Sequence, residues 1–592
     1  MKLKFLLLGF GLSLFVSVCA LNTDTDHYKD GYIQYNAVKL NPGEKQTVKE
    51  SLKRLHERYD PKEKMITSTL KGFNFSIDAQ SGVFHDVRGS IWYAVSLLDL
   101  SDGQYTKRAF DIIDKTITLQ DQDPNSKSCG VWPYYMEEPL STKKSPIDYN
   151  WADFNAVSLL DVWMGHQKKI PEKLKEEIKN SLILAAKSIQ KRNVKNDYTN
   201  IAIMGTYVTY MVSHLFNLPE MQEYAQNRLQ RFYEYTLEKG GFSEYNSPTY
   251  TIVALDDLSR MRLHIVEPGT KKIIDSLYYI TWEMIARHYH QPSGQWAGPH
   301  SRSYSTLVRP SFYALLNEAG KVGIGLEEKR SDVKVKHDIP ENLLHYFLAP
   351  EYPRSEIDVF EKVEPQIIGT TFLTDKYALS SVSLSSLWIQ RRPFLAYWGE
   401  PNNCKYLQIR FLHDNYDFTA ANFYSQQNEN KILAAINFST NGGDKHPHIR
   451  LTDGKFKAKD LRLRFEFGNV KTDELSLPIS NNILKMDIDN LVFDIQLCKS
   501  TFGQFKGHWE KGSEGNASWI DFVIYSDVET DINLSKMNEA ILAFTFSIGS
   551  QTDYFPIVKS EFIMRDGILN AKWENLILNI PVKPSPRIGW IY

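Results

Sequence analysis

The sequence predicts an α+β multidomain protein in which an N-terminal (α/α) toroid of helical hairpins is followed by a C-terminal antiparallel β-sandwich. Up to about residue 320 the apolar residues recur at helical spacing, and from Ile367 onward they alternate with a period of two. A chain of 592 residues is also too long for one hydrophobic core. The expected divisions are a signal peptide (1–20), the toroid (21–320), a connector (321–366) and the sandwich (367–592).

An internal repeat supports the hairpins of the first half. Residues 94–100 (AVSLLDL) recur as residues 156–162 (AVSLLDV), an offset that accommodates two helices of about 20 residues and their loops. Apolar helices alternate with charged ones, which is typical of inner and outer rings and brings the intervening polar loops to one mouth. The other apolar helices are expected at 201–216, 250–264, 273–289 and 305–318, the charged helices at 171–191 and 220–238, and the polar loops at 84–88, 148–151, 196–200, 244–250 and 298–304.

Short runs with alternating hydrophobicity fill the second half. Many such runs, separated by turns such as Asn441-Gly442-Gly443-Asp444, are typical of a large sandwich. The expected strands are 380–390, 404–412, 418–426, 431–437, 461–467, 491–498, 519–524 and 541–547.

The charge and the aromatic content limit the classes of molecule that the protein is expected to bind. The net charge is −2 and no Lys/Arg stripe is present, which argues against nucleic acid. Aromatic residues make up 13% of the chain, and their faces suit sugar rings as well as cores. Beyond the N-terminus only Cys129, Cys404 and Cys498 remain, which is neither a disulfide framework nor a metal knuckle. Nucleic acid is therefore not the expected partner, sugar rings are compatible with the composition, and the oligomeric state stays open.

The N-terminus predicts export. A basic start (Met1–Lys4), a short apolar run and the small residues of Val18-Cys19-Ala20 form a secretory signal with cleavage after Ala20. The run is too short and too interrupted for a membrane span. Cys19 leaves a lipid-anchored form at the cell surface open, although Val18 fits a lipid-attachment motif poorly. The expected location is periplasmic or extracellular.

The stretch 240–250 (GGFSEYNSPTY) is the leading candidate for the site. Gly240 and Gly241 are placed to end one helix, because a Gly just past a helix end can adopt the left-handed conformation, and Ser247-Pro248 to begin the next as N-cap and first helical residue. Tyr250 then lies in the first turn of that helix. A tyrosine-rich turn that merely packs against its neighbours is the alternative.

This layout, Gly-x-x-x-Glu-x-x-Ser-Pro-x-Tyr, resembles the turn that carries the catalytic Tyr in heparinase II/III-like and alginate lyases. Those families place an Asn at the start of an earlier inner helix, matched here by Asn200. They also carry a His-x-His-x-Asp strand pattern, which His413 and Asp417 match while Asn415 replaces the second His. In combination the motifs are most similar to polysaccharide lyase family twenty-seven, the L-rhamnose-α-1,4-D-glucuronate lyases. The resemblance implies β-elimination on rhamnose-capped glucuronate of arabinogalactan.

The chemistry of a uronate lyase gives these residues roles. Removal of the C5 proton requires that the adjacent carboxylate be neutralised, for which Asn200 and His413 are suited and Arg88 and Arg302 are additions. Tyr250 can serve as base or acid, with His300 or Tyr304 as its partner. The predicted catalytic residues are therefore Tyr250, His300, His413, Asn200 and Tyr304, and the predicted substrate-binding residues are Arg88, Arg302, His85, Asn246, Glu244 and Trp151.

Each residue also has a structural interpretation. Asn200 suits a plain N-cap, His413 a buried core histidine, and His300 an exposed loop. His446-Pro447-His448 is more typical of a surface turn than of a zinc site, so no cofactor and no catalytic metal is expected, and a structural ion stays open.

Two other functions remain open. A glycoside hydrolase on the same scaffold needs two carboxylic acids across the sugar. A non-catalytic glycan-binding protein needs only the aromatic loops. The acids available to a hydrolase are Asp86, Asp148, Asp153, Glu244 and Asp256.

Overall fold

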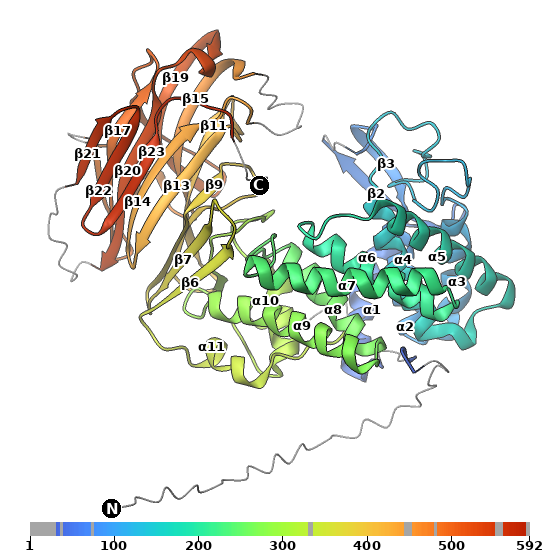
Figure 1. Ribbon diagram of the computed structural model, residues 1–592. Helices are drawn as coiled ribbons and strands as arrows, with labels where there is room; N and C mark the ends of the chain where they lie inside the picture. Colours follow the sequence, from blue (N-terminus) through green and yellow to red (C-terminus); the bar gives the residue numbers. More distant parts are fainter. Residues whose placement is uncertain are drawn as a thin grey trace, which may run out of the picture.

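The computed structural model places a helical half beside a half built of strands (Figure 1). It describes residues 31–35, 39–72, 76–328, 335–442, 453–478, 482–550 and 560–587. The expected leader with Cys19 and the pair His446 and His448 lie outside the described residues. Within them, no helix is both long and apolar enough to cross a membrane.

The helical half consists of hairpins whose first helices contact one another in series. Helix α2 contacts α4, α4 contacts α6, and α6 contacts α8, while each also packs against the helix that follows it in the chain. The inner helices are α2 (Val87–Asp99), α4 (Asn150–His166), α6 (Thr199–Leu215) and α8 (Tyr250–His264), with outer partners α3 (Gly103–Ile117), α5 (Glu172–Arg192), α7 (Pro219–Lys239) and α9 (Pro268–His288). Helices α1 (Pro42–Glu57), α10 (Pro310–Gly320) and α11 (His345–Leu348) complete this half.

The burial of their residues distinguishes the inner helices of the toroid from the outer ones. Every residue of α6 is buried because helices surround it on all sides. On α7 only one stripe is buried, from Met221 through Leu229 to Thr236, and charged residues cover the remaining surface. The apolar and charged helices of the sequence are thus the inner and outer helices of the toroid.

A small antiparallel sheet precedes the toroid and was not expected. Strands β1 (Tyr59–Asp60), β2 (Met65–Lys71) and β3 (Ser81–Asp86) pair in chain order, and β3 leads directly into α2. The exposed side chain of Val83 and the small size of the strands weaken the alternation that would reveal them in the sequence.

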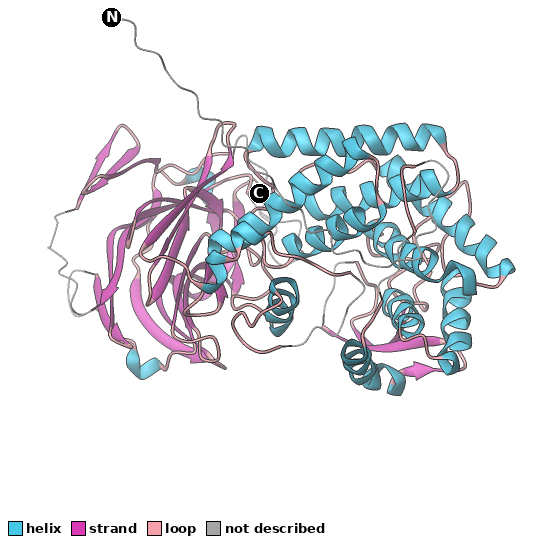
Figure 2. Ribbon diagram, turned by 90° about the horizontal axis from the view of Figure 1, so that it is seen from below, coloured by secondary structure: helices cyan, strands magenta, loops and turns pink. Residues whose placement is uncertain are grey.

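The second half contains two facing antiparallel sheets (Figure 2). One has the order β18-β19-β15-β11-β10-β8-β7-β6, with β12 paired to β11, and the other has the order β16-β17-β20-β14-β13-β9. Aromatic side chains join the sheets: the rings of Phe394 and Phe546 lie 4.8 Å apart, and those of Phe465 and Phe544 lie 5.5 Å apart. A further sheet, β21-β22-β23, packs on β13 and β14.

The strands have the following bounds: β4 (Tyr289–His290), β5 (Gln295–Trp296), β6 (Arg354–Glu361), β7 (Ile367–Leu373), β8 (Tyr377–Val382), β9 (Leu384–Ser386), β10 (Phe394–Trp398), β11 (Lys405–His413), β12 (Tyr416–Asp417), β13 (Ala421–Asn428), β14 (Lys431–Phe438), β15 (Lys455–Gly468), β16 (Ile483–Ile488), β17 (Leu491–Phe502), β18 (His508–Glu514), β19 (Ala517–Asn533), β20 (Ala540–Ser550), β21 (Glu561–Arg565), β22 (Ile568–Trp573) and β23 (Leu576–Pro581). Short 3-10 turns occur at Gln167–Lys169, Glu341–Leu343, Thr472–Glu474 and Leu534–Lys536.

The first strand of the large sheet, β6, lies inside the stretch expected as a connector and joins the two halves. Arg287 of α9 forms ion pairs with Glu356 at 2.7 Å and with Asp358 at 2.6 Å. The ring of Tyr245 stacks on Phe360 at 3.9 Å. These contacts hold the 240–250 turn against the sandwich.

Gly240 ends α7 as expected, and its conformation has a second cause. Its φ is +98°, and a Cβ there would lie 2.3 Å from the carbonyl oxygen of Val359 on β6. Gly241 differs, because a Cβ added to it meets nothing within 4 Å. Only Gly240 therefore requires glycine.

We expect Gly240→Ala to lower the free energy of unfolding by about 1–2 kcal/mol from the left-handed backbone alone, and further through the contact with β6. Gly241→Ala, the adjacent control, should leave it nearly unchanged. Chemical denaturation of both variants measures the difference. Equal stabilities would contradict the role given to Gly240.

Candidate active site

Tyr250 begins α8 and is held there by the preceding turn. The hydroxyl of Ser247 accepts the Tyr250 amide N–H at 3.1 Å and donates to the carbonyl of Arg302 at 2.6 Å. The helix begins at Tyr250, as the expected range 250–264 has it, but its N-cap is Thr249 and not Ser247, whose hydroxyl accepts the Tyr250 amide from outside the helix. Its bonds join the turn to the loop that carries Arg302 and Tyr304.

Two phenols and a guanidinium form the centre of the site. The hydroxyl oxygens of Tyr250 and Tyr304 lie 2.6 Å apart, and Arg302 Nη2 donates to the Tyr250 hydroxyl at 3.0 Å. Burial raises the pKa of Tyr250, the positive charge of Arg302 opposes that rise, and the bond from Tyr304 adds to it. Tyr304 is 55% exposed, so the pair opens to solvent on one side.

Arg302 is anchored from both halves of the protein. Its Nη1 donates to Glu244 at 2.9 Å, and its Nε and Nη2 donate to the Gln390 side-chain oxygen at 3.1 and 2.9 Å. The guanidinium also lies 5.4 Å from the ring of Trp388. Gln390 and Trp388 belong to a sandwich loop, so the strand-built half completes the site through this loop.

Asn200 joins the site through Glu244. The other carboxylate oxygen of Glu244 accepts the Asn200 backbone N–H at 3.3 Å, and Thr199 Oγ1 accepts the Glu244 N–H at 3.2 Å. Burial raises the pKa of Glu244, while the charge of Arg302 lowers it. The Asn200 side-chain oxygen is buried and has no hydrogen-bond partner among the described residues. Asn200 therefore does not serve as a side-chain N-cap, and its backbone ties α6 to α8.

The buried residues His300 and Asn246 support the 240–250 turn from inside the protein. His300 is 2% exposed, its Nδ1 bonds the Asn246 carbonyl oxygen at 2.7 Å, and its backbone pairs with Arg392 at 3.1 and 3.0 Å. Burial lowers the pKa of His300 to about 3, so the ring is neutral at physiological pH. The exposed-loop interpretation of His300 is wrong, because the loop folds under the turn and against the sandwich.

The side chain of Asn246 is used entirely within the protein. Its amide donates to the carbonyls of Ala297 at 2.8 Å and Pro299 at 3.0 Å, and its oxygen accepts the indole N–H of Trp296. The prediction that Asn246 binds substrate is therefore corrected. It shapes the 240–250 turn.

A second group of residues extends the mouth toward α2 and α4. The guanidinium of Arg88 lies 3.8 Å from the ring of Phe154 and 5.6 Å from that of Trp151, and the Arg88 side chain is exposed. Trp151 meets the ring of Tyr134 edge-on at 4.2 Å, and Tyr134 donates to Asp148 at 2.9 Å.

Asn150 and Tyr198 link this group to the phenol pair. The Asn150 amide donates to the Tyr198 hydroxyl at 2.9 Å. Burial raises the pKa of Tyr198, and the charge of Arg302 is close enough to oppose the rise. Polar and aromatic residues at the N-terminal ends of α4 and α6 are thus in contact with one another and lie near the charge of Arg302.

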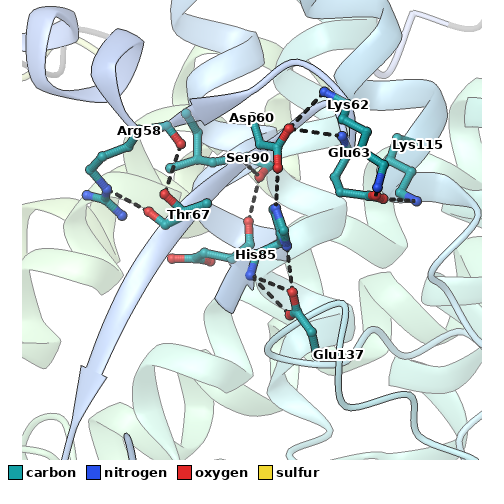
Figure 3. A network of polar contacts seen from close by, with 11 residues as sticks. Arg58, Asp60, Lys62, Glu63, Thr67, His85, Ser90, Lys115 and Glu137 are labelled. Carbon is teal, nitrogen blue, oxygen red and sulfur yellow. Dashed lines mark hydrogen bonds and ion pairs between the residues drawn. The ribbon is translucent and has the colours of Figure 1, made fainter. Parts of the chain in front are cut away.

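His85 belongs to a separate network at the small sheet, as Figure 3 shows. Its Nδ1 lies 2.5 Å from Glu137 and its Nε2 lies 3.2 Å from Asp60. Burial alone would lower the pKa of His85, but the two carboxylates together raise it. Both ring nitrogens are occupied, which corrects the prediction that His85 binds substrate.

His413 lies inside the sandwich, and this corrects its predicted catalytic role. Its Nε2 lies 2.7 Å from the carbonyl oxygen of Lys457, and its ring packs edge-on against Phe418 at 5.5 Å and Phe456 at 5.0 Å. Asp417, the other matched motif residue, pairs with Arg410 at 2.7 Å. Among the described residues, none of these contacts reaches the helical half. The expected cleft shared by Tyr250, Asn200 and His413 is therefore not formed.

Sequence reasoning missed four contributors to the mouth. Tyr198 and Asn150 lie in polar loops that the sequence had singled out, so their neighbourhood was visible although their pairing was not. Gln390 and Trp388 lie in a stretch expected to be strand, and nothing in their spacing indicates that they reach Arg302. Among the described residues, no group of three or more His, Cys, Asp or Glu side chains is arranged to hold a metal ion.

Comparison with known proteins finds one matching family model, of unknown function, and several solved structures of low sequence identity. Residues 45–336 match the family model DUF8769, a domain of unknown function. No curated protein matches the chain. A crystal structure of heparinase III is 8% identical with a TM-score of 0.48, and the match covers 92% of each chain.

Two further solved structures are similar at the same level. Heparan sulfate lyase HepC from Pedobacter heparinus is 8% identical with a TM-score of 0.40, over 92% of this chain and 90% of that one. Chondroitin AC lyase from Streptomyces coelicolor A3, in complex with chondroitin sulphate, is 8% identical with a TM-score of 0.48, over 90% and 84%. Likeness this distant does not carry an activity over to this chain.

We expect Asn246→Ala to destabilise the protein, because it leaves the Trp296 indole and the carbonyls of Ala297 and Pro299 without partners. Each buried unsatisfied group costs about 1–3 kcal/mol. Denaturant unfolding measures the loss. Asn570→Ala, which removes an exposed amide on β22, is the control and should be neutral. A stable Asn246→Ala protein would show that these bonds do not hold the turn.

Proposed function

We propose that this protein is a polysaccharide lyase that cleaves at C4 of a uronic acid by β-elimination. The observation that carries the proposal is the Tyr250–Tyr304 hydroxyl contact of 2.6 Å with Arg302 donating to Tyr250 at 3.0 Å, in a mouth open to solvent. A phenol beside a fixed cation can lose and regain a proton, which the elimination requires of its base and acid.

The mouth is suited to an acidic sugar. Four helices, α2, α4, α6 and α8, present their N-terminal ends to it, and helix N-termini attract anions through their free N–H groups and their dipoles. The side-chain oxygen of Asn200 is buried without a hydrogen-bond partner among the described residues, and its NH2 group is proposed to donate to the uronate carboxylate. Neutralising the uronate carboxylate there lowers the cost of the negative charge that develops when C5 loses its proton.

The two phenols account for both proton transfers, because one accepts a proton and the other donates one. One phenol oxygen, as tyrosinate, takes the C5 proton, the C5–H electrons form the C4=C5 double bond, and the C4–O bond breaks. The other phenol gives its proton to the departing O4. Arg302, held by Glu244 and Gln390, stabilises whichever of the two phenols carries the negative charge.

The carboxylates available to a hydrolase are paired with other groups or, in Asp153, buried with one oxygen that has no hydrogen-bond partner among the described residues. Asp86 caps the Gly89 amide at 2.8 Å, Asp148 accepts from Tyr134, and Asp256 lies 3.0 Å from His337. Asp153 is 2% exposed, and burial raises its pKa to about 7. Glu244 is paired with Arg302 at 2.9 Å. The contacts therefore favour elimination over hydrolysis.

The narrower parts of the proposal rest on the sequence. They are export through the N-terminal leader, attachment through Cys19 as the alternative, and rhamnose-capped glucuronate of arabinogalactan as substrate. The two halves are proposed to act as a catalytic toroid domain and an accessory sandwich domain. Glycan binding without catalysis is the outcome that remains if no turnover is found.

Tyr250→Phe should reduce turnover by about 10²–10⁴-fold while leaving the fold intact, because only the hydroxyl that transfers the proton is lost. The assay follows the absorbance of the 4,5-unsaturated uronate on acidic polysaccharides. Tyr233→Phe on the outer helix α7 removes the same group away from the mouth and should keep full activity. Full activity in Tyr250→Phe would exclude Tyr250 from the mechanism, and new reducing ends without the absorbance would indicate hydrolysis.

The pH dependence should reflect the raised pKa of Tyr250. A raised pKa leaves the phenol protonated at neutral pH, so kcat/KM should rise as the pH increases toward the alkaline range. Glu244→Gln removes a negative charge that raises the pKa of Tyr250, so the rising limb should shift to lower pH. A pH–rate profile of both proteins checks the shift, and a shift in the opposite direction would contradict the roles given to Arg302 and Glu244.

A further inference from the structure

Arg88 is a cation at the open mouth without an anionic partner among the described residues. Its guanidinium rests on the faces of Phe154 and Trp151 at 3.8 and 5.6 Å, and no carboxylate there lies within ion-pair distance. Asp86, the acid next to it in the chain, uses its carboxylate to accept the Gly89 N–H. Arg302 differs, because Glu244 already balances its charge at 2.9 Å.

The surroundings of Arg88 combine solvent exposure with nearby charged groups. The side chain is exposed, yet the protein around it lowers its pKa through desolvation. It is also close enough to Asp257 and Arg260 of α8 to interact with their charges. Solvent-borne ligands can therefore reach a cation that lies near the inner helix α8.

The position is unfavourable for the helix that carries it. Arg88 is the second residue of α2, where a positive charge opposes the helix dipole. Lys173 holds the same second position on α5, but it pairs with Glu177 at 3.5 Å, whereas Arg88 has no such partner among the described residues. Arg88 has no anionic partner among the described residues, lies at the N-terminal end of its helix and stacks on aromatic rings. Its planar guanidinium is therefore suited to binding a planar anionic group such as a carboxylate.

The contacts of Arg88 are distinct from those of the phenol pair. Tyr250 contacts Tyr304, Arg302 and Ser247, and none of these contacts Phe154 or Trp151 in the described structure. Contacts lead from Trp151 through Tyr134, Asp148 and Asn150 to Tyr198, whose pKa responds to the charge of Arg302. A glycan that presents one sugar to Tyr250 would reach Arg88 with another.

From this geometry we infer that Arg88 binds a second acidic group of the glycan, a carboxylate or a sulfate, on a sugar other than the one cleaved. The inference rests on the proposed function and narrows it. The favoured substrate class is then a glycan with acidic groups on at least two sugars. A glycan with a single uronate capped by neutral sugars becomes the less favoured substrate. Phe154 and Trp151 hold the guanidinium in position by cation–π contact.

Calorimetric binding to the Tyr250→Phe protein tests the inference without turnover. The probes are an oligoglucuronate and an equally long oligosaccharide of neutral sugars carrying one glucuronate. We expect Arg88→Gln to weaken oligoglucuronate binding at least about tenfold, as loss of a charge-assisted hydrogen bond does, and to change binding of the singly acidic probe less than about twofold. Arg88→Lys should recover part of the loss. Arg231→Gln, which removes an exposed charge on α7, should change neither.

The outcomes are separable. Equal weakening toward both probes would mean that Arg88 binds the cleaved uronate itself, and no weakening toward either would mean that it binds no ligand; both overturn the inference. Failure of the parent protein to bind oligoglucuronate would overturn it too. Absence of unsaturated product from the wild-type protein would defeat the elimination proposal alone, because the binding comparison does not depend on turnover.

Discussion

The ion pair between Glu244 and Arg302 is the interaction on which the rest of the site depends. Glu244 is buried, so its charge is tolerable only because Arg302 and the Asn200 backbone N–H satisfy it. Arg302 in turn reaches Tyr250 and Gln390 with its remaining donors. One guanidinium therefore fixes the start of α6, the start of α8 and a loop of the sandwich relative to one another.

This arrangement explains why the protein needs both halves. The helical half supplies the phenols and the helix N-termini, but the loop with Arg302 and Tyr304 is held in place by the sandwich. His300 pairs its backbone with Arg392, and Ser303 N–H donates to the Gln390 carbonyl at 2.6 Å. The sandwich positions the loop with Arg302 and Tyr304 without, in the described contacts, placing a titratable side chain beside Tyr250.

Particular elements show how far sequence reasoning reached. The periodicity placed α8 over residues 250–264 because its buried and polar residues are arranged at helical spacing. The left-handed Gly240 followed from the helix end before it. The Tyr250, Arg302, Glu244 and Tyr304 cluster was anticipated because these residues share short segments at the same ends of helices. His413 was misplaced because a strand pattern reports which face a side chain occupies, and not which neighbouring element that face meets.

The sequence by itself determined the two fold classes and their order, the helix ends that carry polar residues, and the identity of the phenol at the start of α8, because these depend on local periodicity and capping. Only the tertiary structure decided that Gln390 and Trp388 reach Arg302, that Asn246 and His300 are buried supports, and that His413 belongs to the sandwich core. Those outcomes depend on contacts between residues far apart in the chain, and such contacts are set by how the two halves pack and leave no periodic signal in either segment.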